Sequence, residues 1–231
     1  MKILIIVPAY NEEESIPGVI GDLEAHLPDA DILVVNDGSR DNTAQIAREL
    51  GSRVIDLPYN LGIGGAVQAG YLYAERFGYD VAVQFDGDGQ HLAEEIKKLL
   101  RPLAEGTADL VIGSRFLVPG GYKSPFFRRL GIAIFSLVLT RILGKEITDS
   151  TSGFRAVNRK VIEFFSGTYP DDYPEVEALV LLHKMNLRMT EVAVRMRERT
   201  GGTSSITPVR SVYYMTKVLI AIAIDLMKKM R

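Results

Sequence analysis

One pattern repeats five times within residues 1–113: a short run rich in apolar residues, a polar or glycine-rich turn, and then a helical pattern. The apolar runs are Lys2–Pro8, Ala30–Asp37, Arg53–Leu57, Asp80–Asp86 and Asp109–Gly113. They are continuous rather than alternating, which is typical of strands buried on both faces of a sheet. The helical patterns between them are Ser15–His26, Asn42–Leu50, Ile63–Phe77 and Ala93–Ala104. This alternation predicts right-handed β-α-β units and an α/β fold with a mostly parallel sheet.

The pattern changes after Gly113, and the elements become less regular. The expected elements are a helix at Arg128–Leu143, a strand at Phe154–Asn158, a helix at Glu175–Met185, a strand at Met189–Val194, a glycine-serine loop at Thr200–Ser205 and a helix at Pro208–Arg231. We expect one large domain with a helical appendage.

Composition excludes several classes of protein. The formal net charge of −2 provides no general basic field for nucleic acid, and the lack of cysteine excludes disulfides, thiolate zinc sites and a cysteine nucleophile. The first apolar run leads straight into polar residues, so we expect no cleavable signal peptide. No window of about 20 apolar residues occurs, so we expect no membrane-spanning helix. These features are typical of a cytoplasmic globular enzyme.

Polar or glycine-rich segments follow each of the five predicted strands. These segments are Pro8–Glu13, Asn36–Ser39, Asn60–Gly65, Asp86–His91 and Gly113–Arg115. Ligands of open parallel sheets bind outside the carboxyl ends of the strands. We therefore expect a crevice of nucleotide size at this edge of the sheet.

Two common nucleotide-binding motifs are missing. A dinucleotide-binding fold requires Gly-x-Gly-x-x-Gly after the first strand, where this chain has Pro8-Ala9-Tyr10. The later Gly62-Ile63-Gly64 is followed by Val67 where the third glycine belongs, and no phosphate-binding loop of the Gly-x-x-x-x-Gly-Lys type occurs.

The segment Asp86-x-Asp88-x-Gln90 is the strongest chemical signal. Two carboxylates and an amide oxygen on alternating residues can point the same way, and hard oxygen ligands suit Mg²⁺ or Mn²⁺ shared with substrate phosphates. The alternative is a surface turn, because Asp and Gly favour turns. His91 either extends the metal site or packs at a helix start.

With these residues, the chain resembles the family-two glycosyltransferases of GT-A fold, and most of all the dolichyl-phosphate mannose synthases and bacterial polyprenyl-phosphate hexosyltransferases. The similarity extends from Ile3 to Ser205. The motifs that carry it are Pro8–Glu12, Asn36–Ser39, Asn60–Gly62, Asp86–His91, Gly113–Arg115 and Asp149–Arg155. Ser205 departs from the dolichyl group, which often has lysine there, and the membrane helices of many bacterial relatives are missing.

The resemblance implies a role for each motif. The nucleotide-binding residues would be Pro8, Tyr10, Glu12, Asp37, Gly62 and Asp86. The ligands of Mg²⁺ or Mn²⁺ would be Asp86, Asp88 and Gln90. The acceptor-phosphate residues would be Arg115, Arg129, Arg199 and Ser152. The catalytic set would be Asp88, Asp149, Arg115 and Arg199.

The expected reaction is metal-dependent, inverting transfer of a hexose from a UDP- or GDP-sugar to a polyprenyl phosphate. A lipid phosphate is already an anion at pH 7 and needs cations to hold it, whereas a sugar hydroxyl needs a carboxylate base. Asp149 and Glu177 are the candidate bases, although Asp149 is equally suited to bracing its own loop. Transfer to a saccharide hydroxyl and a non-catalytic nucleotide-sugar-binding subunit are the alternatives.

The last segment combines a narrow polar stripe with a wide apolar face. Its longest apolar run, Val218–Ile224, has seven residues and is too short to span a membrane. We expect a GT-A catalytic domain at 1–206 and an amphipathic helix at 207–231 that lies on the inner face of the plasma membrane. The other interpretation is that this helix packs on the catalytic domain, on a second copy in a homo-oligomer or on a membrane-protein partner.

Overall fold

The structure is a computed structural model that describes residues 1–117, 126–170, 174–197, 217 and 220, with the backbone alone for residues 126–133. The predicted site residue Arg199 and nearly all of the predicted helix 207–231 lie outside the described residues.

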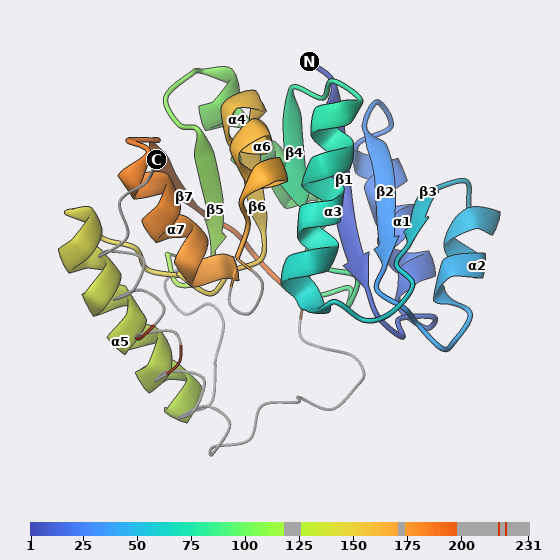
Figure 1. Cartoon of the computed structure of the whole chain (residues 1–231), viewed down its shortest axis with the longest axis horizontal. Helices are drawn as coiled ribbons and strands as arrows, with labels where there is room; N and C mark the ends of the chain where they lie inside the picture. The colour runs from blue at the N-terminus through green and yellow to red at the C-terminus, as the bar shows by residue number, and fades with distance from the viewer. Residues whose placement is uncertain (118–125, 171–173, 198–216, 218–219, 221–231) are drawn as a thin grey trace.

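Seven strands form one sheet in the order β3-β2-β1-β4-β6-β5-β7 (Figure 1). Their bounds are β1 Ile3–Ala9, β2 Asp31–Asn36, β3 Arg53–Asp56, β4 Val81–Gln84, β5 Leu110–Ser114, β6 Arg155–Asn158 and β7 Met189–Ala193. Strand β6 is antiparallel to β4 and β5, and the other pairings are parallel. The predicted mostly parallel α/β sheet is therefore confirmed.

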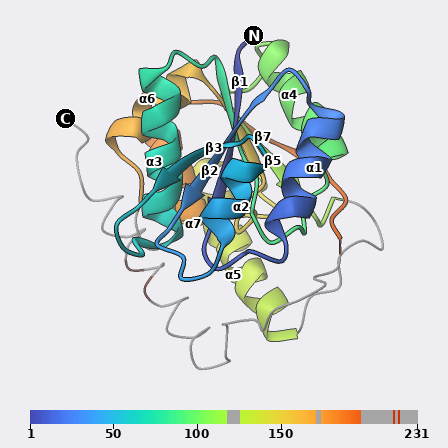
Figure 2. The same ribbon diagram turned by 90° about the vertical axis from the view of Figure 1, so that its right-hand side faces the viewer.

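Helices cover both faces of the sheet (Figure 2). Their bounds are α1 Ile16–His26, α2 Thr43–Glu49, α3 Gly62–Arg76, α4 Ile96–Ala104, α5 Phe126–Leu143, α6 Arg159–Gly167 and α7 Pro174–Lys184, and a 3₁₀ turn, Ala93–Glu95, precedes α4. The core on one face comes from α3, α5, α6 and α7, and the core on the other from α1, α2 and α4. Each face buries a continuous apolar layer against the strands, which explains their unbroken apolar runs.

Two features differ from the sequence-based expectation. Strand β3 is half exposed, so the prediction that all five early strands are buried on both faces is wrong for Arg53–Leu57. The reason is its place at the sheet edge, where Arg53 pairs with Asp31 across the strands and solvent covers the outer side. Helix α6 was not expected. It begins after Asn158, whose side chain accepts a hydrogen bond from the Val161 amide as an N-cap.

The antiparallel strand β6 determines the layout of the functional edge. Because β6 runs opposite to β4 and β5, its first residue lies at the same edge as their last residues. The loop before β6 covers residues 144–154, and its second half is therefore placed between the polar segments that follow β4 and β5.

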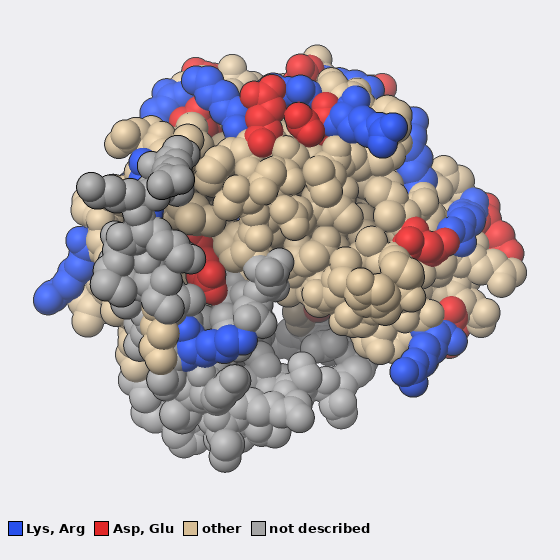
Figure 3. All heavy atoms as spheres, viewed as in Figure 1, with Lys and Arg blue, Asp and Glu red and all other residues tan. Residues whose placement is uncertain are grey.

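Surface charge is mixed. On the described part of the face in Figure 3, Lys and Arg side chains are interspersed with Asp and Glu, in keeping with the formal charge of −2. Within the described ranges, no helix combines the length and the apolar composition needed to cross a membrane.

Candidate active site

A pocket of about 310 Å³ opens where β1, β2 and β4 end and α3 begins. The residues that line it are Pro8, Ala9, Tyr10, Glu12, Asp37, Asn60, Gly62, Ile63, Ala66, Asp86, Gly87 and Asp88. All six residues expected to bind the nucleotide are in this set, together with Asp88 from the expected metal site. The structure thus brings together residues that are up to 80 positions apart in the sequence.

Asp37 organises one wall of the pocket. Its carboxylate accepts hydrogen bonds from the amides of Leu61 (2.7 Å) and Gly62 (3.0 Å). Burial raises the pKa of Asp37, and these two amide bonds only partly oppose the rise. Gly38 lets the neighbouring loop approach, since a Cβ there would lie 2.9 Å from the backbone of Tyr59. The loop over 59–62 is therefore fixed to the end of β2.

Ser15 joins two other walls. Its hydroxyl donates to the carbonyl of Gly87 and lies within hydrogen-bond distance of a Glu12 carboxylate oxygen, both at 2.7 Å. The amide of Glu12 donates to Thr43 Oγ1 at 2.8 Å. Ser15 thus connects the loop after β1 to the loop after β4, and both loops line the pocket.

His91 holds the Asp86 carboxylate. The Nε2 atom of His91 lies 3.0 Å from Asp86 Oδ2, and the His91 side chain is 2% exposed whereas that of Asp86 is 36% exposed. The imidazole stacks on Phe154 at 4.6 Å between ring centroids. Burial alone would raise the pKa of Asp86, but His91 and Gln84 outweigh it and lower the pKa, so the carboxylate is ionised at neutral pH. His91 therefore packs beneath Asp86 and orients it.

The donor set fits a divalent cation that is shared with a ligand. Asp86 and Asp88 line the same pocket, and Asp88 Oδ1 accepts a hydrogen bond from the Gln90 amide at 3.0 Å. The Gln90 carbonyl accepts from the Arg197 amide, and Gln90 is not among the pocket-lining residues. In the described part of the chain, no three His, Asp or Glu side chains form a metal cluster. Mg²⁺ and Mn²⁺ commonly use one or two carboxylates plus phosphate oxygens, which is the set available here.

Arg115 and Asp149 form a buried ion pair. Asp149 Oδ2 accepts from the Arg115 amide (3.1 Å) and Nε (2.7 Å), and Oδ1 accepts from Nη2 (2.7 Å). The Arg115 side chain is 6% exposed and that of Asp149 is 0% exposed. A bidentate pair of this kind fixes both groups in the plane of the guanidinium. Of the two roles left open for Asp149, this geometry favours bracing.

The structure says less about two other residues predicted to bind the acceptor phosphate, Ser152 and Arg129. Ser152 is buried, and its hydroxyl donates to the Gly113 carbonyl at 2.8 Å. Arg129 lies in the first part of α5, where the structure describes only the backbone.

Sequence reasoning assigned no role to two charged residues of this region, of which Arg155 was named only as the end of the motif Asp149–Arg155. Arg155 is fully buried and donates to the carbonyls of Ser150, Ser152 and Glu175. Glu191 in β7 accepts hydrogen bonds from Thr148 and Asp149. A usable signal was present for Glu191, because it is an acidic residue in the middle of a predicted strand.

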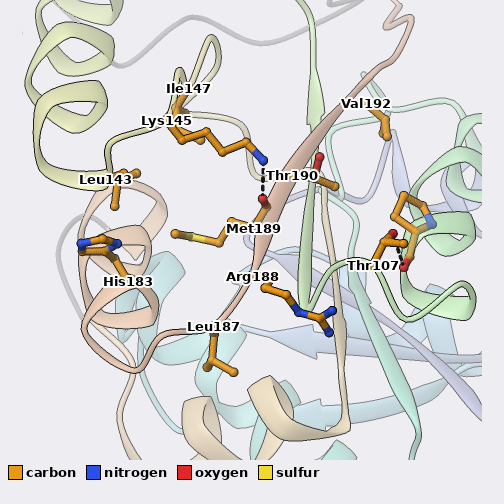
Figure 4. Close-up of a pocket in the computed structure, with 11 residues that line it drawn as sticks. Thr107, Leu143, Lys145, Ile147, His183, Leu187, Arg188, Met189, Thr190 and Val192 are labelled. Atoms are coloured by element: carbon orange, nitrogen blue, oxygen red, sulfur yellow. Dashed lines mark hydrogen bonds between the residues drawn. The ribbon is translucent and has the colours of Figure 1, made fainter.

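A second cavity of about 470 Å³ lies along β7 (Figure 4). Lys145 donates from Nζ to the Met189 carbonyl at 2.8 Å, and Arg188 is bound to Asp109. None of the predicted site residues lines this cavity, so we place the active site in the pocket at the ends of β1, β2 and β4.

Comparison with known proteins identifies the family of this chain. The chain belongs to glycosyl transferase family 2, whose family model matches residues 4–165. It is 34% identical over 213 residues to UDP-N-acetylglucosamine–dolichyl-phosphate N-acetylglucosaminyltransferase of Methanococcus voltae, with 84% of each chain covered. It is 35% identical over 217 residues to undecaprenyl-phosphate mannosyltransferase of Micrococcus luteus, with 90% of this chain and 88% of the relative covered.

A solved structure shares the fold. Glucosyl-3-phosphoglycerate synthase from Mycobacterium tuberculosis, in complex with Mn²⁺, UDP-glucose and phosphoglyceric acid, superposes with a TM-score of 0.74 at 20% identity. The match covers 96% of this chain and 80% of that chain. The predicted GT-A fold and glycosyltransferase class are therefore confirmed.

Proposed function

We propose that this glycosyltransferase moves a hexose from a UDP- or GDP-sugar to a polyprenyl phosphate. The names of the two relatives support this acceptor, since both transfer a sugar to a dolichyl or undecaprenyl phosphate. The structural observation that carries the proposal is the buried Arg115–Asp149 pair. Both Asp149 oxygens already accept hydrogen bonds from Arg115, so this carboxylate is poorly placed to take a proton from an acceptor.

The donor would occupy the pocket at the ends of β1, β2 and β4. Tyr10, Asp37 and Gly62 would contact the nucleoside, and Asp86 and Asp88 would face the diphosphate. A bound Mg²⁺ or Mn²⁺ supplies positive charge that stabilises the leaving diphosphate. The place of Asp86 and Asp88 in the pocket lining supports this role, because Mg²⁺ and Mn²⁺ prefer carboxylate oxygens as protein ligands.

The acceptor would be held by arginines. An oxygen of the lipid phosphate attacks the anomeric carbon, the bond from that carbon to the donor phosphate oxygen breaks, and the anomeric configuration inverts. Because the lipid phosphate is an anion at pH 7, no proton has to be removed. Arg129 and Arg199 would bind it bidentately, as guanidinium groups bind phosphate, and Arg115, whose Nε and Nη2 atoms bind Asp149, would contact it with Nη1.

A comparison of acceptors tests this proposal. Purified protein with Mn²⁺ is given UDP- and GDP-sugars and one of three acceptors: undecaprenyl phosphate, undecaprenol or a panel of saccharides. Release of the nucleoside diphosphate is then measured. We expect release to accelerate only with the lipid phosphate. Acceleration by undecaprenol or a saccharide would favour a hydroxyl acceptor, and no release with any acceptor would favour the non-catalytic alternative.

We also propose that residues 1–206 form the catalytic domain and that residues 207–231 bind the inner face of the plasma membrane as an amphipathic helix. The support is the wide apolar face of that segment and its basic end, Lys228, Lys229 and Arg231. Removing residues 207–231 should abolish flotation with anionic liposomes while leaving nucleotide binding intact. A full-length protein that never floats would show that the segment is a packing element.

A further inference from the structure

The central residue of strand β7 is a glutamate that holds a distant turn. Glu191 Oε2 accepts hydrogen bonds from the Thr148 amide (2.8 Å) and the Thr148 hydroxyl (2.9 Å). Glu191 Oε1 accepts from the Asp149 amide at 2.8 Å. Both carboxylate oxygens are therefore bound to Thr148 and Asp149, which form a turn in the loop before β6. Hydrogen bonds to an ionised acceptor are stronger than neutral ones, so this turn is held firmly.

The turn at Thr148 and Asp149 orients Arg115. Asp149 binds the Arg115 amide and two atoms of its guanidinium, with all four groups buried. Thr148 Oγ1 also lies 2.7 Å from Ser114 Oγ, next to Arg115 in the chain. A displacement of the turn would therefore be transmitted to the guanidinium, because the bidentate pair has a single good geometry.

The loop has a second attachment to β7 that does not involve Asp149. Lys145 Nζ donates to the Met189 carbonyl at the start of the strand. This contact holds the loop near β7 when the carboxylate of Glu191 is changed. The role of Glu191 can therefore be separated from attachment of the loop as a whole.

We propose that Glu191 is a positioning residue that sets the orientation of Arg115 through Asp149, and thereby the affinity for the acceptor phosphate. The inference rests on the proposed function, in which Arg115 binds that phosphate. In this proposal Glu191 contacts neither substrate directly. It affects binding of the acceptor phosphate and not of the nucleotide donor, because neither Thr148 nor Asp149 lines the nucleotide pocket.

Glu191→Gln is the test variant. Glutamine has the same size as glutamate and keeps one acceptor oxygen. Its NH₂ group replaces the other oxygen and cannot accept the hydrogen bond that the turn donates there. We expect the KM for undecaprenyl phosphate to rise about tenfold to a hundredfold, which matches the loss of one hydrogen bond to a charged group. The KM for the nucleotide sugar and the Kd for the nucleoside diphosphate should stay within about twofold. Thr190→Val, one residue away and facing the second cavity, is the matched control and should change none of these three constants (Figure 4).

A double-mutant cycle separates positioning from stability. If Glu191 acts through Arg115, adding Glu191→Gln to Arg115→Lys should raise the acceptor KM by less than about twofold. The proposal would be overturned if the two substitutions raised the acceptor KM independently, so that their effects multiplied in the double variant. It would also be overturned if Glu191→Gln raised the donor and acceptor KM values together. If Glu191→Gln fails to fold, Thr148→Val removes the hydroxyl that binds both Glu191 and Ser114 Oγ, and it should raise the acceptor KM alone. An unchanged acceptor KM in that variant would also overturn it.

The same measurements distinguish this inference from the proposed function. A wild-type protein that does not use undecaprenyl phosphate contradicts both. A wild-type protein that uses it, with a Glu191→Gln variant of unchanged acceptor KM, contradicts the positioning role alone.

Discussion

Replacing Asp149 by asparagine should destabilise the protein strongly. The change removes the negative charge from a pair in which Arg115 is 6% exposed and Asp149 is 0% exposed. The guanidinium is then buried with no counter-charge from its main partner, and the new NH₂ group faces N–H donors of Arg115. Removing one member of a buried pair typically lowers the free energy of unfolding by about 3–5 kcal/mol. For a chain of 231 residues this corresponds to a fall in Tm of roughly 6–20 °C.

Urea unfolding followed by circular dichroism measures this loss. Glu163→Gln is the matched control, because the Arg159–Glu163 pair lies on the surface of α6 and should contribute at most about 0.5 kcal/mol. The double variant Asp149→Asn/Arg115→Gln should recover part of the stability, since it removes both charges. A loss below about 1 kcal/mol in Asp149→Asn, or no recovery in the double variant, would refute the buried-pair argument.

Three further predictions concern the metal site and pH. Asp88→Ala should leave the fold intact and abolish the strengthening of UDP or GDP binding by Mn²⁺, measured by calorimetry. Gly153→Ala should weaken Mn²⁺-dependent nucleotide binding about tenfold or more, because the added Cβ would lie 3.0 Å from both carboxylate oxygens of Asp86. Asp109 should add at most about 2 kcal/mol of stability above pH 4 and lose it as pH falls toward 2. Burial would raise its pKa, but the bonds to Arg188 and neighbouring groups lower it from 3.8 to about 2.

Each of these three has a control. Asp29→Ala changes an exposed aspartate away from the pocket and should keep the metal effect. Gly21→Ala adds a Cβ with no atom within 4 Å and should leave binding unchanged. Asp109→Asn should remove the difference in stability between pH 5 and pH 2 that is due to this group. A metal effect that persists in Asp88→Ala, normal binding in Gly153→Ala, or an unchanged pH profile in Asp109→Asn would contradict the respective prediction.

The sequence predicted the parts of the fold that depend on local pattern. Strand and helix positions followed from apolar runs and their periodicity, and the polar segments after the strands predicted residues that line the pocket at the ends of β1, β2 and β4. The place of β6 between β4 and β5 could not be read this way. That pairing joins Gln84 to Arg155, and nothing in either segment alone specifies the partner or the antiparallel direction. The exposure of β3 is a property of its edge position, which is likewise set by the whole sheet.

Long-range polar contacts set a similar limit on the prediction of the site. The sequence indicated a carboxylate at Asp149 and an arginine at Arg115, but not that they bind each other across 34 positions. No role was assigned to Arg155 or Glu191 because Arg155 contacts Glu175 of α7 and Glu191 contacts the loop before β6, both of which are distant in the sequence. Residue type and spacing within one motif predicted that Asp86 and Asp88 face the pocket, but also included Gln90, which does not line it. The pairing of charged side chains, such as Arg115 with Asp149, could be seen only in the folded structure.

Mass spectrometry of the lipid product shows whether the protein transfers a hexose to a polyprenyl phosphate. Wild-type protein is incubated with Mn²⁺, a mixture of UDP- and GDP-hexoses and undecaprenyl phosphate, and the extracted lipid is analysed. Our account predicts a species heavier than undecaprenyl phosphate by one hexose residue, formed from one donor of the mixture and missing with Asp88→Ala. Undecaprenyl phosphate that stays unchanged, while a parallel incubation with a panel of saccharides shows sugar transfer, would contradict it.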